Sequence, residues 1–325
     1  MVEKILFDMK KHKWLNTLFV APMESFNKLL SDMKKHKWLY VMLVIPVLFV
    51  LIWNYWPMYG VVIAFKDYSP AFGIWDSPWV GFKHFQRFFD SYFFLEIIIN
   101  TIRVSFYSLL VGIPLPIILA LMFNEIKRKW FKSTVQTVSY IPNFISVVVV
   151  IGMVTFFFSE QGSINQILTS LHMKPIDFLG DAKWFPHVYV WSGIWQGVGW
   201  GTLIYTAAMS GVPQDQYEAA YLEGATRMQC IRNITIPAIM PTIVISAILA
   251  TGSVMSVGFE KAYLLQNASN LATSEVLSTY TYKVGLINGE YSFSAAVGLF
   301  NNIVNFIMLF VVNKIAQKTG ENSLW

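Results

Sequence analysis

Long apolar stretches separated by short polar segments run through the chain from about residue 39 onwards. A bilayer core about 30 Å thick is crossed by roughly 20 apolar residues in a helix. Several stretches reach this length, including one that opens with LYVMLVIPVLFVLIW, whereas the fourth is rich in Trp and Gly and is the least apolar. The pattern predicts six transmembrane helices, over residues 39–65, 97–123, 135–158, 184–210, 238–258 and 293–312.

The predicted spans also contain residues that break or weaken helices in water. Pro114 and Pro116 lie in the second span, and the fourth and fifth spans are rich in small residues. Neighbouring helices satisfy the backbone groups that such residues free in a membrane. Small residues also let helices approach closely. We therefore expect these positions to serve mainly helix packing.

Composition agrees with a membrane protein. Only 13% of the 325 residues are charged and the mean hydropathy is +0.50, whereas soluble domains carry roughly 25% charged residues. These values exclude a disordered chain and an ordinary nucleic-acid binder, although the net charge is +5. The single cysteine, Cys230, excludes a disulfide framework and a multi-cysteine zinc site. We expect an all-α polytopic membrane domain over residues 38–317, preceded by an N-terminal segment, residues 1–37.

The distribution of Lys and Arg predicts the orientation. Sixteen of the 24 lie in the N-terminus, the 124–134 loop, the 211–237 loop and the C-terminus; seven lie in the opposite loops, and Arg103 lies within a span. The 19 acidic residues are divided almost equally. Cytoplasmic loops carry the excess of Lys and Arg, so we expect both termini in the cytoplasm.

The N-terminal segment carries the octapeptide DMKKHKWL twice, at residues 8–15 and 32–39. Its apolar run is short and is followed by more cations without a small-residue cleavage site, so it is not a cleavable signal peptide. An amphipathic segment at the inner membrane surface is the first interpretation. A partner-docking arm is the alternative.

The polar loop between the fourth and fifth spans, residues 211–241, reads GVPQDQYEAAYLEGATRMQCIRNITIPAIMP. Pro213 suits the first position of a helix, acidic residues follow it where negative charge is favoured, and Gly224 suits a left-handed helix end. A second short helix is expected from about Thr226 towards Pro237. These features predict two short cytoplasmic helices at an angle, either as a docking element or as a loop lying on the surface.

This loop resembles the EAA signature of ATP-binding-cassette (ABC) importer permeases. The resemblance rests on Glu218, Ala219, Ala220, Gly224, Ile234, Ile236 and Pro237 at the family's spacing, with Ile236 where the family usually has Leu. Further stretches resemble the carbohydrate-uptake branch, and within it the permeases for complex or acidic oligosaccharides, including the alginate importer: NYWPMYGVVIAFKDYSP, SPWVGFKHF, PIILALMFNEI, SYIPNFIS and SEVLSTYTYKVGLINGEYSFSAAVGLF. The resemblance covers most of residues 36–313.

The resemblance implies a type I ABC importer permease fold in a bacterial inner membrane and a division of labour among subunits. A second permease completes the path, two cytoplasmic ATPase subunits bind ATP and Mg²⁺, and an extracytoplasmic solute-binding protein delivers the sugar. The EAA loop lies in a groove of the ATPase and drives alternating access. The chain itself contains no G-x-x-x-x-G-K-[ST] phosphate loop, so we expect a non-catalytic subunit without a cofactor or metal of its own.

Sugars are bound by aromatic faces together with amides and charges in a concave path. The fourth span carries Trp191 and Trp195 on one helix face, although interfacial anchoring also explains membrane tryptophans. An intramembrane cation is costly and marks a functional position by default, but Arg103 lies near its span's start, so it either snorkels to the outer interface or faces the path and a uronate. The candidates are Asn100, Arg103, Asn143, Trp191, Trp195, Gln196, Trp200, Asn301, Asn302 and Asn305.

Two other classes of function require features that the sequence lacks. A membrane-embedded enzyme needs a compact cluster of ionisable residues at the membrane boundary, and none stands out in the sequence. An ion-coupled secondary transporter normally needs more spans or an internal repeat, together with acidic residues deep in a span. The sequence offers neither, so we expect a transport permease.

Overall fold

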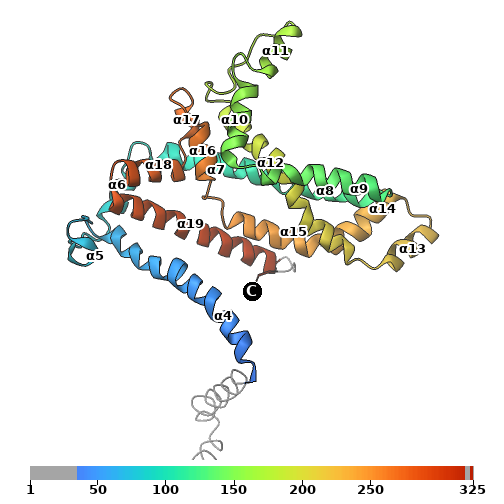
Figure 1. The fold of residues 1–325 in the computed structure, drawn as a ribbon, viewed down its shortest axis with the longest axis horizontal. Coiled ribbons are helices and arrows are strands. Elements are labelled where there is room, and N and C mark those ends of the chain that lie inside the picture. Colours follow the sequence, from blue (N-terminus) through green and yellow to red (C-terminus); the bar gives the residue numbers. More distant parts are fainter. Residues whose placement is uncertain (1–34, 319–322, 325) are drawn as a thin grey trace, which may run out of the picture. The chain divides into compact units, whose positions relative to one another are not determined.

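The computed structural model describes residues 35–318, 323 and 324. In this part of the chain the secondary structure is helical, apart from an isolated antiparallel bridge between Lys66 and Trp79 (Figure 1). The chain divides into two compact units, Met1–Val62 and Ile63–Trp325. The first copy of the repeated octapeptide and residues 32–34 of the second lie outside the described residues.

The described part of the first unit is a long apolar helix. It consists of α4 (Lys37–Val50), a π-helical turn (Leu51–Tyr55) and a 3₁₀ segment (Trp56–Phe65) that runs past the boundary between the units. No residue of α4 is buried. At 29 residues, Lys37–Phe65 is long and apolar enough to cross a membrane, and it matches the first predicted span.

Four further candidate crossings lie in the second unit: Phe94–Glu125, Val147–Ser170, Arg227–Thr251 and Tyr291–Lys318. The first is formed by α7 (Phe94–Gly112) and α8 (Pro114–Glu125), and its prolines lie in the first turn of α8, where a missing N–H costs no hydrogen bond. The others contain α10 (Val147–Phe158) with α11 (Ser163–Ser170), α15 (Ile236–Thr251) and α19 (Tyr291–Lys318).

The fourth predicted span is α12 (Phe185–Ser210), a helix of 26 residues. It is long enough to cross a bilayer but less apolar than the five candidates. The helix contacts α7, α8, α9 (Lys129–Tyr140), α10 and α15, so much of its surface faces protein (Figure 1). A Cβ at Gly199 would overlap the carbonyl oxygen of Ser139 on α9. This small residue therefore lets α12 and α9 approach closely, as expected for the fourth span.

Two predicted spans have different bounds. The third, 135–158, is not one helix: α9 ends at Tyr140, a 3₁₀ turn covers Ile141–Phe144, and Ser146 caps the start of α10 by accepting a hydrogen bond from the amide of Val149. The fifth, 238–258, ends early, because α15 stops at Thr251 and turns follow. In the third predicted span, Pro142 and the hydroxyl of Ser146 interrupt the helix despite the apolar pattern.

Short helices fill the remaining connections. They are α5 (Gly73–Asp76), α6 (Lys83–Phe89), α13 (Gln214–Leu222), α14 (Arg227–Cys230), a π turn (Ile231–Thr235), α16 (Phe259–Leu265), α17 (Leu271–Ser274), α18 (Leu277–Tyr282) and a second π turn (Lys283–Ile287).

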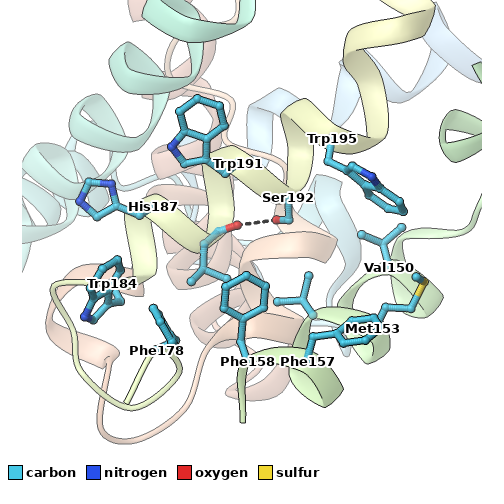
Figure 2. A pocket seen from close by; sticks show the side chains of 12 residues that line it. Val150, Met153, Phe157, Phe158, Phe178, Trp184, His187, Trp191, Ser192 and Trp195 are labelled. Carbon is cyan, nitrogen blue, oxygen red and sulfur yellow. Dashed lines mark hydrogen bonds between the residues drawn. The ribbon is translucent and has the colours of Figure 1, made fainter. Parts of the chain in front are cut away.

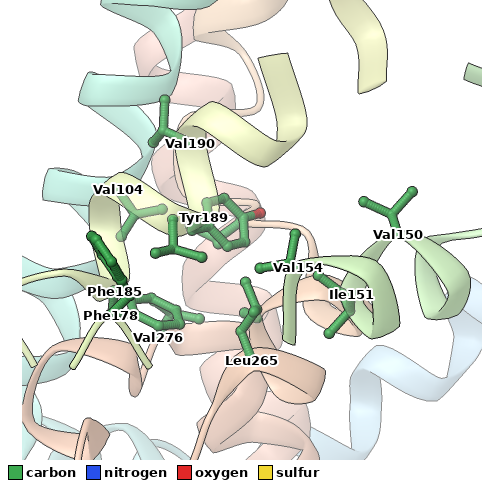
Figure 3. Close-up of a cluster of buried hydrophobic side chains, with 13 residues drawn as sticks. Val104, Val150, Ile151, Val154, Phe178, Phe185, Tyr189, Val190, Leu265 and Val276 are labelled. Carbon is green, nitrogen blue, oxygen red and sulfur yellow. The ribbon is translucent and has the colours of Figure 1, made fainter. Parts of the chain in front are cut away.

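A buried apolar cluster joins α7, α10, α12 and α16 (Figure 3). Val104 of α7, Val154 of α10, Phe185 of α12 and Leu265 of α16 belong to it, together with Val276. Side-chain amides fix the loops around this core: Asn305 of α19, for example, accepts a hydrogen bond from the amide of Met255 at 2.8 Å. The cluster holds α12 in a fixed position against α7 and α10, where the candidate site lies.

Candidate functional site

The loop that joins α12 to α15 begins with the short helix α13. Pro213 is its N-cap, one position earlier than predicted. Gly224 has φ +81°. Its amide donates a hydrogen bond to the carbonyl of Tyr221 at 3.0 Å, and the amide of Ala225 donates to the carbonyl of Ala220 at 2.9 Å. These two bonds form a Schellman motif, so the predicted left-handed helix end at Gly224 is confirmed.

The second arm of the loop differs from the prediction. Thr226 and Gln229 form a capping box at the start of α14. Helical structure then passes through the π turn Ile231–Thr235 into α15 without a break. The predicted helix start near Thr226 is therefore confirmed, whereas its predicted end near Pro237 is wrong: a single helical segment, Arg227–Thr251, extends from the loop to the end of the fifth crossing. Pro237 is accommodated in the first turn of α15, after the π turn.

The loop presents apolar side chains to solvent. Leu222 is 90% exposed and Met228 is 71% exposed, with Tyr221 half exposed beside them. Exposed apolar groups of this kind mark interaction surfaces when they gather in one place. Glu218 and Ala219 are exposed and Ala220 is partly buried on the same helix, whereas Ile234 and Ile236 are partly buried in the second arm. The signature residues thus lie in both arms of the loop.

A cavity of about 570 Å³ lies between α10 and α12 (Figure 2). Its lining is aromatic and apolar, and it includes both tryptophans that the sequence singled out, Trp191 and Trp195. Ser192 contributes a hydroxyl, which donates to the backbone carbonyl of Val188. The full lining is Val150, Met153, Val154, Phe157, Phe158, Phe178, Trp184, His187, Val188, Trp191, Ser192 and Trp195.

A second cavity, of about 560 Å³, lies between α7 and the start of α12 and contains Arg103. His187 lines both cavities. Tyr107 of α7 connects the two helices here: its hydroxyl lies 3.1 Å from Nδ1 of His187 and accepts a hydrogen bond from Nε1 of Trp191 at 2.8 Å. Arg103 and the tryptophans therefore border neighbouring hollows on one side of α7 and α12.

The remaining candidates are not gathered at these cavities. The amide of Asn100 donates to the carbonyls of Ala272 and Glu275, and that of Gln196 to the carbonyl of Ile145, so both hold the fold. Asn305 is likewise bound to a loop, as described above. The others line neither cavity: Asn143 lies in the 3₁₀ turn, Trp200 packs on Phe144, and Asn301 and Asn302 lie on α19.

Several residues of the cavities were missed in the sequence. Trp184 and His187 belong to the face that carries Trp191 and Trp195, and the spacing of three, four and four residues is a helical signal that a reading by residue type overlooks. Lys183 and Tyr107 become visible only when α7 and the start of α12 are placed together. The described residues contain no group of three or more His, Cys, Asp or Glu suited to a metal ion.

Charged groups in the connections between the spans are mostly paired. The hydrogen bond from Lys83 holds the pKa of Asp67 below its ordinary value. The hydrogen bond that Arg87 donates to the carboxylate of Glu290 raises the pKa of Arg87. Lys261 of α16 is different, because burial lowers its pKa to about 7; its Nζ donates to the carbonyl of Tyr189 at 2.5 Å and lies 4.7 Å from the centre of that ring.

Comparison with known proteins identifies the class of protein. Residues 112–321 match the family described as "Binding-protein-dependent transport system inner membrane component". The chain belongs to this family. Protein LplB of Bacillus subtilis (strain 168) is 42% identical over 280 residues, which cover 86% of this chain and 88% of LplB.

A second relative and two solved structures agree. The polygalacturonan/rhamnogalacturonan transport system permease protein YteP of Bacillus subtilis (strain 168) is 40% identical and covers 86% of this chain and 87% of YteP. A bacterial ABC transporter involved in the import of the acidic polysaccharide alginate contains a chain with a TM-score of 0.82 and 38% identity, covering 90% of this chain and 99% of that one. The structure of bacterial alginate ABC transporter in complex with alginate pentasaccharide-bound periplasmic protein gives 0.83 and 36%, covering 91% and 100%.

The family settles the general role of the chain. It is an inner-membrane permease subunit of a binding-protein-dependent ABC transport system, with the type I permease fold of its structural relatives. Permeases of this family are not catalytic, since the ATPase is a separate chain. A membrane-embedded enzyme is thereby excluded.

Proposed function

We propose that this chain is one of two permease subunits of an ATP-driven importer that moves oligosaccharides inward by alternating access. The observation that supports it most directly is the loop between α12 and α15, where a Schellman-ended helix carries exposed apolar side chains. A second permease completes the path, and two ATPase subunits bind ATP and Mg²⁺. An extracytoplasmic solute-binding protein delivers the sugar. This chain binds no cofactor.

The loop couples the permease to the ATPase. Helix α13, with Glu218, Ala219 and Ala220, lies in a groove of the ATPase and places Leu222 against its apolar lining. Because Arg227–Thr251 is a single helical segment, displacement of the loop is transmitted directly to the fifth crossing. Rigid-body motion of packed helices then switches the access of the path.

Both termini and this loop lie in the cytoplasm. The excess of Lys and Arg in the corresponding segments supports this orientation. It places the start of α12, with Lys183 and His187, on the outer side, and α13 on the inner side where the ATPase binds. A reporter that functions only in the cytoplasm is expected to be active when it is fused to the C-terminus.

The substrate class is argued from the aromatic cavity. Tryptophan faces bind the apolar faces of pyranose rings, and Trp191 and Trp195 line one hollow about 570 Å³ in volume, which falls in the range of ligand pockets. The relatives named above include a polygalacturonan/rhamnogalacturonan permease and chains of an alginate transporter. An acidic oligosaccharide such as alginate is the finer form of the proposal.

Uptake into proteoliposomes tests this function. The complex that co-purifies with the chain is reconstituted with ATP inside and its solute-binding protein outside. Labelled alginate pentasaccharide, pentagalacturonate and the carboxyl-reduced (neutral) form of each are supplied as probes. The proposal predicts ATP-dependent uptake of at least one of them. It fails if the complex contains no ATPase, or if uptake of every probe is independent of ATP.

A further inference from the structure

Most cations of the predicted outer segments are already engaged within the described part of the chain. Each has an ion pair or donates to a backbone carbonyl, and this group comprises Lys66, Lys83, Arg87, Lys261 and Lys283. Three cations of the outer half have no such partner among the described residues: Arg103, Lys174 and Lys183. Their positive charges are therefore available to a ligand.

Two of these three unpaired cations line the same hollow. Arg103 approaches from α7 and Lys183 from the residues before α12, and the cavity between them measures about 560 Å³. Asp181 does not neutralise this pair by an ion pair; its carboxylate instead accepts a hydrogen bond from the backbone amide of Lys183 at 3.0 Å. Both Arg103 and Lys183 are exposed, so a ligand can reach them, and an anionic ligand would offset the cost of an unpaired Arg in a membrane span.

The cationic cavity is continuous in its lining with the aromatic cavity. His187 belongs to both linings, and Figure 2 shows it beside Trp184 and Trp191. The hydroxyl of Tyr107 binds both His187 and Trp191, at 3.1 and 2.8 Å. This hydrogen-bonded bridge joins the linings of the two cavities, so the two cations lie at one end of a tryptophan-lined surface.

We propose that Arg103 and Lys183 bind the carboxylates of a uronate-containing oligosaccharide, while the tryptophans of the adjoining cavity stack on its pyranose rings. The inference rests on the proposed function and adds the residues that bind the carboxylates of the substrate. The guanidinium fork of Arg103 matches a carboxylate in two parallel hydrogen bonds, and Lys183 adds a point charge for a second contact. Each sugar unit of a polyuronate carries both a pyranose ring and a carboxylate, so one oligosaccharide can stack on the tryptophans and reach the cations at the same time.

The matched probes are an alginate pentasaccharide and pentagalacturonate, each compared with its carboxyl-reduced form. The reconstituted complex is measured as wild type, Arg103→Gln, Lys183→Gln, the conservative Arg103→Lys, and Lys174→Gln. The last variant removes the third unpaired cation, which lines neither cavity, and is the control. Uptake of the neutral probe reports whether each variant is folded and coupled.

The wild type is expected to take up the acidic probe with the higher apparent affinity. Arg103→Gln and Lys183→Gln should each raise the half-saturating concentration of the acidic probe on the order of tenfold, which is the loss of one charge-assisted contact. For the neutral probe, the two Gln variants should keep the wild-type half-saturating concentration. For the acidic probe, Lys174→Gln should also keep the wild-type value, and Arg103→Lys should recover part of the affinity that Arg103→Gln loses. The effect should diminish at high salt.

Equal losses for acidic and neutral probes overturn the inference, because the cations would then serve the fold or a lipid phosphate. A requirement for anionic lipid that the two Gln variants abolish also overturns it in favour of lipid. ATP-driven uptake of neutral probes alone refutes the charge recognition and leaves the proposed function intact. Absence of ATP-driven uptake for every probe refutes both.

Discussion

The hydroxyl of Tyr217 lies 2.9 Å from the hydroxyl of Thr235, and this hydrogen bond joins the two arms of the loop between α12 and α15. Thr235 is buried in the π turn, whereas Tyr217 lies on α13. The contact therefore fixes the first arm, which carries Glu218 and Ala219, against the helical segment that continues into the membrane. A rigid angle between the arms is what a coupling element needs in order to transmit motion.

Removing this hydroxyl should loosen the coupling. Tyr217→Phe leaves the buried hydroxyl of Thr235 with only its longer hydrogen bond, at 3.5 Å, to the carbonyl of Cys230, and is expected to cost about 1 kcal/mol of local stability. ATP hydrolysis by the complex should then support less uptake, so the number of sugars moved per ATP falls. Tyr263→Phe is the matched control, because the hydroxyl of Tyr263 makes no hydrogen bond among the described residues. Unchanged stoichiometry in Tyr217→Phe would contradict a mechanical role for the contact.

Gly224 tests the helix end of α13 by backbone conformation alone. Its φ is +81° and an added Cβ would meet open space, so a substitution there strains the backbone without a clash. Gly224→Val is expected to cost roughly 1–2 kcal/mol and to uncouple ATP hydrolysis from uptake or to dissociate the ATPase. Gly224→Asn should be tolerated, because Asn adopts the left-handed conformation. The copurified ATPase, measured per permease, distinguishes the two; equal retention with full transport in both variants would refute the assignment.

Gly199 and Gly197 form a pair for the packing of α12. A methyl group at Gly199 would overlap the backbone of α9, whereas nothing lies within 4 Å of one at Gly197. Gly199→Ala should lower the free energy of unfolding by about 1–3 kcal/mol through overpacking. Gly197→Ala should be neutral or stabilising by up to about 1 kcal/mol through helix propensity. Thermal melting of the purified complex measures both, and the same melting temperature for the two variants would show that α9 and α12 do not approach as described.

Lys261 gives a pH dependence. Burial lowers its pKa from 10.5 to about 7, so between these values the unfolded chain binds a proton that the folded chain does not. The free energy of unfolding should therefore rise as the pH increases from about 7 towards 10, and the cost of the buried charge is fully present below pH 7. Lys261→Met should raise the melting temperature at pH 6 and flatten this rise. Lys174→Met, at an exposed site, is the control; parallel pH curves for wild type and Lys261→Met would exclude the effect.

The sequence predicted the crossing helices best where one apolar stretch forms one element. The spans at α4 and α12 fall close to their predicted bounds. Helix α12 is less apolar than the other spans because neighbouring helices cover much of it. The prediction failed where local chemistry interrupts an apolar run, as at Ser146, which caps α10. It also failed at Pro237, where the second short helix was expected to end, because Pro237 follows a π turn inside a continuous helical segment.

The candidate site was predicted in part for a similar reason. The left-handed helix end at Gly224 follows from the local backbone preference of glycine, so the sequence alone predicted it. The face with Trp191 and Trp195 follows from helical spacing. By contrast, the proximity of Arg103 to Lys183 depends on the tertiary packing of α7 against α12 and has no signal in the order of residues. Asn100 and Gln196 were chosen by residue type, and the structure shows that their amides hold loop carbonyls.

The most direct test of the central claim is photocrosslinking from position 222 in the intact complex. Leu222 is 90% exposed on the loop, so a benzophenone amino acid placed there meets whatever covers this surface. The account predicts a covalent adduct with the ATPase subunit, and none from the exposed position Ile167 on α11. An adduct from position 167 instead, or no ATPase adduct from position 222, would contradict the proposal that this loop couples the permease to ATP hydrolysis.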